Sequence, residues 1–177
     1  MGINEYSFPF ERQSTVDLSD GTLTKLWNAA DKTLDLLTHE NYNDSYQEFR
    51  SYIQTSWYAA RCNYAIYNDP YIIRRMLIQH AQNQQPNGIF PMFAPDHPQD
   101  HNFPGILESD LFWQMSLFDY YMQTADKETV ESLLGNLKRN LLAFDELENR
   151  DGLIEEPPHT YWIDWATLNR EGASLTV

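Results

Sequence analysis

The sequence of 177 residues is poor in cysteine and in basic residues. Its single cysteine, Cys62, excludes an internal disulfide framework and a zinc site built from several cysteines. Lysine and arginine number 12 against 26 aspartate and glutamate residues, which gives a formal net charge of −14. Because such a surface repels phosphate groups and anionic lipid head groups, we expect neither nucleic acid nor membrane as a partner.

Long hydrophobic runs are also missing. No apolar run approaches the roughly 18 residues that a membrane span needs, and residues 1–10 lack the basic region and apolar stretch of a signal peptide. We therefore expect a soluble protein that is cytoplasmic, or periplasmic or extracellular if it is part of a longer secreted protein. Hydrophobic residues make up 42% of the chain, which is enough for the core of one domain.

Apolar residues recur at helical spacing in five segments of the chain. The first helix follows an N-cap at residues 19–21 and runs to about Thr38. A second helix spans roughly residues 52–67. The third starts at Pro70, since proline suits the first turn of a helix, and stops before Pro86.

The second half of the chain adds two helices. Ser109 offers a cap for the fourth helix, which runs to about Met122, and Asp126 opens a fifth that runs to about Phe144. Five of the nine prolines lie in residues 86–105, so we expect a long functional loop there. The chain after the fifth helix is again irregular, and only the extreme N-terminus has any strand character.

The helices form a weak internal repeat. An aromatic-rich helix, a short turn and a second, amphipathic helix occur twice, and matching turns at Asn87-Gly88 and Asp151-Gly152 follow. Glycine there can take the positive φ of a turn. We expect the aromatic helices to be buried nearly all round as an inner layer, with their partners outside. A closed ring needs about six such hairpins, so five helices make about half a ring.

Seven segments, taken in order and spacing, resemble one family of enzymes. They are residues 39–44, 84–89, 94–96, 111–113, 118–121, 151–153 and 161–166. These segments are similar to the six-hairpin catalytic domain of bacterial α-L-rhamnosidases, family 78 of the glycoside hydrolases. The resemblance implies an all-α fold of the (α/α)6 barrel type, here a partial barrel of about five helices over residues 19–177, after a lead-in segment at residues 1–18.

The resemblance also implies inverting hydrolysis of terminal α-L-rhamnosyl linkages, which needs two carboxyl groups roughly 6.5–9.5 Å apart. Asp44 matches the first residue of the family's acid motif. Glu48 reaches the general-acid position when one residue is deleted between the two. Ser45 and Tyr46 then replace Cys-Pro, and Thr55 replaces a second aspartate. The family's general base lies outside this chain, so we do not expect the chain alone to turn over substrate.

A second group of residues fits a sugar-binding wall. Aromatic rings pack on the C–H face of a sugar while carboxylates bind its hydroxyls. The candidates are Tyr52, Trp113, Trp162, Asp164 and Trp165. The alternative is that aromatic residues at helical spacing, Trp113 in particular, are core residues.

The catalytic candidates have structural alternatives too. Glu48 is also a carboxylate that a helix start favours, and Asp44 is also a plain N-cap. Four further residues between positions 96 and 101 have the chemistry of metal ligands: Asp96, His97, Asp100 and His101. Their spacing matches no strong motif and prolines break the local helix, so we expect no metal and no cofactor.

Three hypotheses follow from the sequence. In the first, the chain is a piece of a rhamnosidase-like glycosidase that is inactive by itself, with carbohydrate as its partner. In the second, it is a non-catalytic helical module that binds carbohydrate or another partner. In the third, it is a half-barrel that pairs with another chain, because an incomplete ring leaves an apolar edge that should associate.

Overall fold

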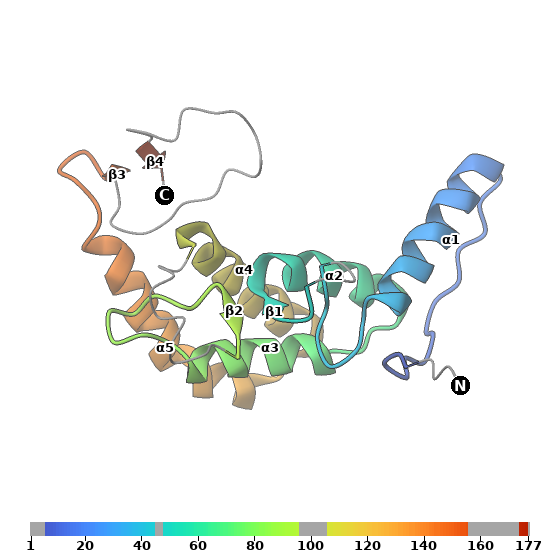
Figure 1. The fold of residues 1–177 in the computed structure, drawn as a ribbon, viewed down its shortest axis with the longest axis horizontal. Coiled ribbons are helices and arrows are strands. Elements are labelled where there is room, and N and C mark those ends of the chain that lie inside the picture. The colour runs from blue at the N-terminus through green and yellow to red at the C-terminus, as the bar shows by residue number, and fades with distance from the viewer. Residues whose placement is uncertain (1–5, 45–47, 96–105, 156–173, 177) are drawn as a thin grey trace.

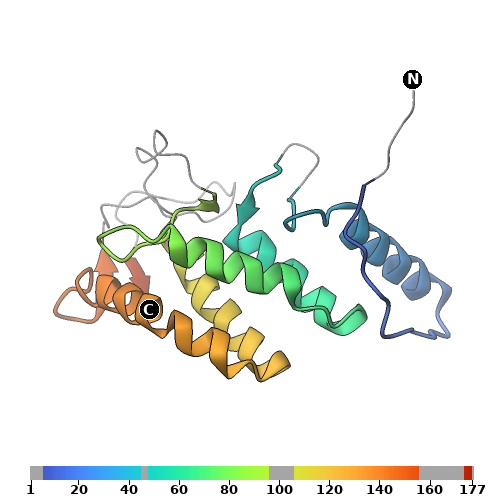
Figure 2. The same ribbon diagram turned by 90° about the horizontal axis from the view of Figure 1, so that it is seen from below.

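The computed structural model describes residues 6–44, 48–95, 106–155 and 174–176. Within this part of the chain, five helices dominate: α1 (Gly21–Leu36), α2 (Ile53–Ile66), α3 (Tyr71–Gln82), α4 (Leu107–Thr124) and α5 (Lys127–Asp145). Figure 1 shows α1 at one end of the molecule and α5 near the other. In Figure 2, α3, α4 and α5 lie side by side, while α1 stands apart from them. The expected helical architecture is confirmed.

Two of the predicted helix caps are present in the structure. The Asp20 carboxylate accepts hydrogen bonds from the backbone N–H groups of Thr22 (2.7 Å) and Leu23 (3.1 Å), so α1 begins where the sequence predicts. Asp126 caps α5 in the same way and accepts from the N–H of Thr129 at 3.0 Å. Both caps satisfy N–H groups that have no partner within the helix.

The predicted start of α4 is wrong by three residues. The helix begins at Leu107, and its N-cap is Ile106, which makes no side-chain cap hydrogen bond. Ser109 lies inside the first turn, where its N–H donates to the carbonyl of Ile106 at 2.9 Å. Glu108 also lies in this turn, and a negative charge there is favourable at a helix N-terminus, so α4 starts without a serine cap.

The prediction that strand character is confined to the extreme N-terminus is wrong, because strands form elsewhere in the chain. Residues 1–5 lie outside the described residues. Residues 6–20 contain no strand. Instead, β1 (Ser51–Tyr52) pairs with β2 (Phe93–Ala94), and β3 (Leu153–Glu155) pairs with β4 (Ser174–Thr176), both antiparallel. Strands of two or three residues are too short to display an alternating pattern. The structure therefore adds small sheets at the ends of the helices.

The internal repeat is confirmed at the turns. Asn68 after α2 and Ala125 after α4 both have a φ of 53°, although neither is a glycine. Gly88 after α3 and Gly152 after α5 have φ values of 89° and 74°. Equivalent turns therefore close equivalent helices, as the sequence predicts.

A main hydrophobic core joins all five helices, and a smaller one joins the start of α4 to the end of α5 and to β3. The prediction that the aromatic helices are buried nearly all round is wrong for this chain. Large apolar side chains of α2 and α4 are exposed: Tyr58, Met115, Phe118, Tyr121 and Met122. The side chains of the described residues leave this face of the inner helices uncovered.

Candidate functional site

A short turn after α1 positions Asp44. Thr38 and Tyr42 form an isolated antiparallel bridge, and the N–H of Asn43 donates to the carbonyl of Leu37 at 2.9 Å. The Tyr42 side chain is almost fully buried in the main core. The turn is therefore fixed from inside, and it presents the exposed side chain of Asp44 at its end.

Strand β1 anchors the segment that carries Glu48 and Tyr52. Tyr52 pairs with Phe93 of β2, and the two rings meet edge to face at 5.4 Å between centroids. The guanidinium of Arg50 lies 4.2 Å from the centroid of the Phe93 ring. Because β2 follows α3, the pairing ties the start of α2 to a segment far away in the sequence.

Asp44, Glu48 and Tyr52 interact with one another. Partial burial raises the pKa of the Glu48 carboxyl, and the charge of Asp44 and a hydrogen bond between the two side chains raise it further. Burial also raises the pKa of the Tyr52 hydroxyl, with the negative charge of Glu48 as the next cause. A carboxyl group beside a second carboxylate holds its proton more firmly, which is what a general acid requires.

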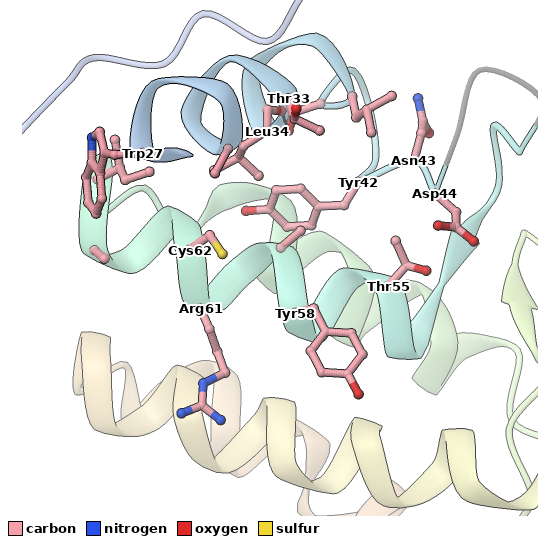
Figure 3. A pocket seen from close by; sticks show the side chains of 16 residues that line it. Trp27, Thr33, Leu34, Tyr42, Asn43, Asp44, Thr55, Tyr58, Arg61 and Cys62 are labelled. Atoms are coloured by element: carbon pink, nitrogen blue, oxygen red, sulfur yellow. Dashed lines mark hydrogen bonds between the residues drawn. The ribbon is translucent and has the colours of Figure 1, made fainter. Parts of the chain in front are cut away.

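A groove between α1 and α2 begins beside this cluster. Its volume is about 660 Å³, and Figure 3 shows Asp44 and Thr55 at one end and Trp27 at the other. Small and apolar side chains form much of its lining, among them Ala30, Leu34, Ala59 and Ala65. The site thus combines a carboxyl pair with a neighbouring apolar groove.

A second cavity of about 400 Å³ lies between α2 and α4, and the sequence analysis did not identify it. Arg61, Tyr64, Asp119 and Gln123 line it. The Trp57 indole N–H donates to Asp119 at 3.0 Å, and the guanidinium of Arg61 lies 4.9 Å from the Trp57 ring centroid. The sequence signal that could have indicated this cavity is the spacing of its polar residues. Arg61 and Tyr64 are three positions apart on α2, and Asp119 and Gln123 are four positions apart on α4.

Of the remaining predicted sugar-binding residues, the structure describes Trp113 alone. Trp113 has 0% exposure, its indole N–H donates to the carbonyl of Leu77 at 3.2 Å, and its ring packs on Phe90. The structure thus places Trp113 in the core. Trp162, Asp164 and Trp165 lie outside the described residues, as do the four acidic and histidine residues between positions 96 and 101.

The described residues contain neither a cluster of metal-ligand side chains nor a membrane-spanning helix. No three histidine, cysteine, aspartate or glutamate side chains of residues 6–44, 48–95 and 106–155 come together in a way that could hold a metal ion. None of the helices in the described part of the chain has both the length and the hydrophobicity for crossing a membrane.

Two solved structures are similar to this chain in fold. One is the GH78 family rhamnosidase of Bacillus sp. GL1, with a TM-score of 0.84 and 19% identity over 96% of this chain. The other is a rhamnosidase from Klebsiella oxytoca with rhamnose bound, with a TM-score of 0.76 and 24% identity over 87% of this chain. The matched parts are 17% and 31% of those two proteins.

No curated protein sequence matches the chain. Residues 11–176 match the family described as the bacterial α-L-rhamnosidase six-hairpin glycosidase domain, which is nearly the whole sequence. The described helices and both structural neighbours fit a partial α/α barrel of this kind. The chain therefore belongs to the six-hairpin glycosidase domain family of bacterial α-L-rhamnosidases.

Proposed function

We propose that this chain forms one wall of the catalytic centre of an inverting α-L-rhamnosidase, with Glu48 as the general acid. The observation that carries the proposal is the contact between Asp44 and Glu48, which raises the pKa of Glu48. A general acid must keep its proton near neutral pH until the leaving oxygen needs it. Membership of the family, and the rhamnose bound to the Klebsiella oxytoca protein, support a rhamnosyl group as the ligand.

Asp44 does not serve as the base in this mechanism. An inverting enzyme holds its two carboxyl groups roughly 6.5–9.5 Å apart so that a water molecule fits between acid and base. Asp44 and Glu48 are hydrogen-bonded to each other, which leaves no such space. Asp44 instead keeps the proton on Glu48 and accepts hydrogen bonds from sugar hydroxyls, and the base comes from outside this pair.

The proposed sugar-binding wall consists of Tyr52 with Trp162, Asp164 and Trp165. Tyr52 belongs to β1, at the start of α2, and is half-buried. The negative charge of Glu48 contributes to the raised pKa of its hydroxyl. A half-buried aromatic ring beside a carboxyl pair suits the C–H face and the hydroxyls of one sugar. The buried ring of Trp113 supports the core behind this wall and does not touch the ligand.

The test replaces Glu48 by glutamine in a protein that carries this chain together with the rest of the barrel. It compares two α-L-rhamnosides, one with an alkyl and one with an activated aryl leaving group. Loss of a general acid costs about a hundredfold or more for the alkyl glycoside, while the activated aryl group leaves with little protonation. Glu146→Gln is the control, because Glu146 is equally exposed but lies at the end of α5. Equal rates of hydrolysis of the alkyl glycoside by Glu48→Gln and by the unsubstituted protein would contradict the assignment of Glu48 as the general acid.

A second candidate function is carbohydrate binding without cleavage. It is favoured by the close contact of the two carboxyl groups and by Thr55 at the position where the family has an aspartate. In this case titration calorimetry detects L-rhamnose binding to the chain, but neither glycoside is hydrolysed. Glu48→Gln then leaves the dissociation constant nearly unchanged, whereas Tyr52→Ala weakens it.

A further inference from the structure

The ring of Phe93 in β2 contacts two side chains of the segment that carries Glu48. It meets the Tyr52 ring edge to face, with 5.4 Å between the two centroids, and the guanidinium carbon of Arg50 lies 4.2 Å from the Phe93 centroid. The two strands pair directly (Figure 1), with Tyr52 opposite Phe93. One aromatic ring therefore touches both the phenol of the proposed sugar-binding wall and a cation two positions after Glu48.

Burial separates the role of Phe93 from that of its two partners. Phe93 is 7% exposed, whereas Tyr52 is half-buried and Arg50 is exposed. A residue as buried as Phe93 has little surface to offer a sugar, but it can fix the orientation of a neighbouring ring that does have such surface. Phe93 is therefore placed to act on a ligand through Tyr52.

The segment that carries Phe93 is itself fixed to the core. Three residues earlier, Phe90 has 0% exposure, and its backbone N–H donates to the Asp110 carboxylate of α4 at 3.1 Å. The Phe90 ring lies 4.4 Å from the ring of Trp113, measured between centroids, and Ala94 also has 0% exposure. Because close packing on both sides of position 93 restricts the backbone, the Phe93 ring has a defined place from which to orient its partner.

We propose that Phe93 is a positioning residue, which holds the Tyr52 ring in the orientation that packs on the C–H face of the sugar. The inference rests on the proposed function, because Tyr52 belongs to the proposed sugar-binding wall. Tyr52 is also the N-cap residue of α2 and makes no side-chain cap hydrogen bond, so the helix start does not fix its ring. The edge-to-face contact with Phe93 does so, and a ring that is already ordered loses less entropy when a sugar binds.

A second aromatic pair provides a matched comparison, because it has the same chemistry at another place in the chain. The rings of Phe10 and Tyr67 are stacked at 4.6 Å between centroids, and the guanidinium carbon of Arg12 lies 5.5 Å from the centroid of the Tyr67 ring. Tyr67 directly follows α2, whereas Tyr52 directly precedes it, so a helix of 14 residues, about 20 Å long, separates the two pairs. Removal of the Phe10 ring therefore costs packing without disturbing the candidate site.

The test measures hydrolysis of an aryl α-L-rhamnoside by a protein that carries this chain together with the rest of the barrel. Phe93→Leu should raise KM about three- to tenfold with kcat nearly unchanged, because a disordered Tyr52 ring weakens the binding of substrate and transition state alike. In the Tyr52→Ala background, Phe93→Leu should change KM no further, since the ring that it positions is already gone. Phe10→Leu is the control and should leave KM unchanged.

A second readout does not depend on hydrolysis. With 3-fluorotyrosine at position 52, the fluorine-19 resonance should move in Phe93→Leu, which removes the ring current of Phe93, and should stay in place in Phe10→Leu. Far-UV circular dichroism verifies that each variant is folded, and Phe93→Met is a second ring-free variant if Phe93→Leu does not fold.

An unmoved resonance or an unchanged KM in the folded ring-free variant overturns the positioning role of Phe93. An equal rise of KM in the Tyr52→Ala background also overturns it, because the effect would then not pass through Tyr52. If the unsubstituted protein neither hydrolyses the glycoside nor binds L-rhamnose, the proposed function fails instead, and the fluorine resonance alone decides whether Phe93 orients Tyr52.

Discussion

At the residue scale, Gly88 and Gly152 occupy equivalent turns under different constraints. Both have a positive φ, which strains any side chain by about 1 kcal/mol or more. A Cβ atom on Gly88 would also lie 2.4 Å from the carbonyl oxygen of Arg139 in α5, whereas one on Gly152 would have no heavy atom within 4 Å. Gly88 thus allows a close approach of two backbones as well as a turn.

We expect Gly152→Ala to lower the free energy of unfolding by about 1 kcal/mol, which is the cost of the backbone conformation alone. Gly88→Ala should lower it by about 3 kcal/mol or more, because a contact between backbone atoms relaxes only if α5 moves. Urea denaturation measures both losses in the same chain. Equal losses would mean that α5 shifts freely and that the close approach is unimportant.

Asp110 is a buried carboxyl group that joins three segments. It accepts hydrogen bonds from the backbone N–H of Phe90 at 3.1 Å and from the side-chain amide of Asn140 in α5. Burial raises its pKa to about 8, although both hydrogen bonds act in the opposite direction. Asp110 has 0% exposure and lines neither of the two cavities described above, so we assign its role to folding.

The raised pKa of Asp110 makes stability depend on pH. Between pH 3.8 and about 8 the folded chain holds a proton on Asp110 that the unfolded chain has lost. The contribution of Asp110 to the free energy of unfolding therefore falls as pH rises. His80, buried and with its pKa lowered to about 4, acts oppositely, but only below pH 6.5. From pH 6.5 to 8 we expect the free energy of unfolding of the unsubstituted chain to fall by up to about 1.4 kcal/mol per pH unit relative to that of Asp110→Asn. Denaturation of both proteins across this window measures the difference, and parallel curves would contradict it.

At the scale of elements, the helices could be predicted because their causes are local. Asp20 and Asp126 cap α1 and α5 through neighbours two or three residues away, and apolar spacing marks the buried faces. The small sheets could not be predicted, because β1 and β2 are more than forty residues apart and each has two residues. Their pairing depends on how α2 and α3 pack.

The part of the candidate site that is local in sequence could be predicted, and the part that depends on contacts between helices could not. Asp44, Glu48 and Tyr52 are near in sequence, so a motif places them together, and the structure has them interacting. The burial of Trp113 and the cavity that Arg61 and Asp119 share depend on contacts between different helices. A pattern along one helix does not say which of its faces meets the core, the lumen of a ring or another chain.

At the scale of the whole molecule, the helices are held unequally. α3 buries Ile72, Ile73, Met76, Leu77 and His80, whereas α1 buries Leu34 alone. Besides Leu34 and the partly buried Trp27, polar contacts hold α1, such as the hydrogen bond from the Tyr67 hydroxyl to Asp31 at 2.8 Å. The groove that separates α1 from α2 removes the apolar contacts that would otherwise secure it. One side of this partial barrel is therefore weaker than the other.

Hydrogen exchange followed by mass spectrometry tests this inequality. Local opening exposes backbone amides according to the free energy that holds each element, so in dilute solution α1 amides should exchange at least about tenfold faster than those of α3. Slow exchange in α1 of the dilute monomer would mean that its polar contacts alone are sufficient, and the groove would then be a rigid cavity rather than an open edge of the barrel.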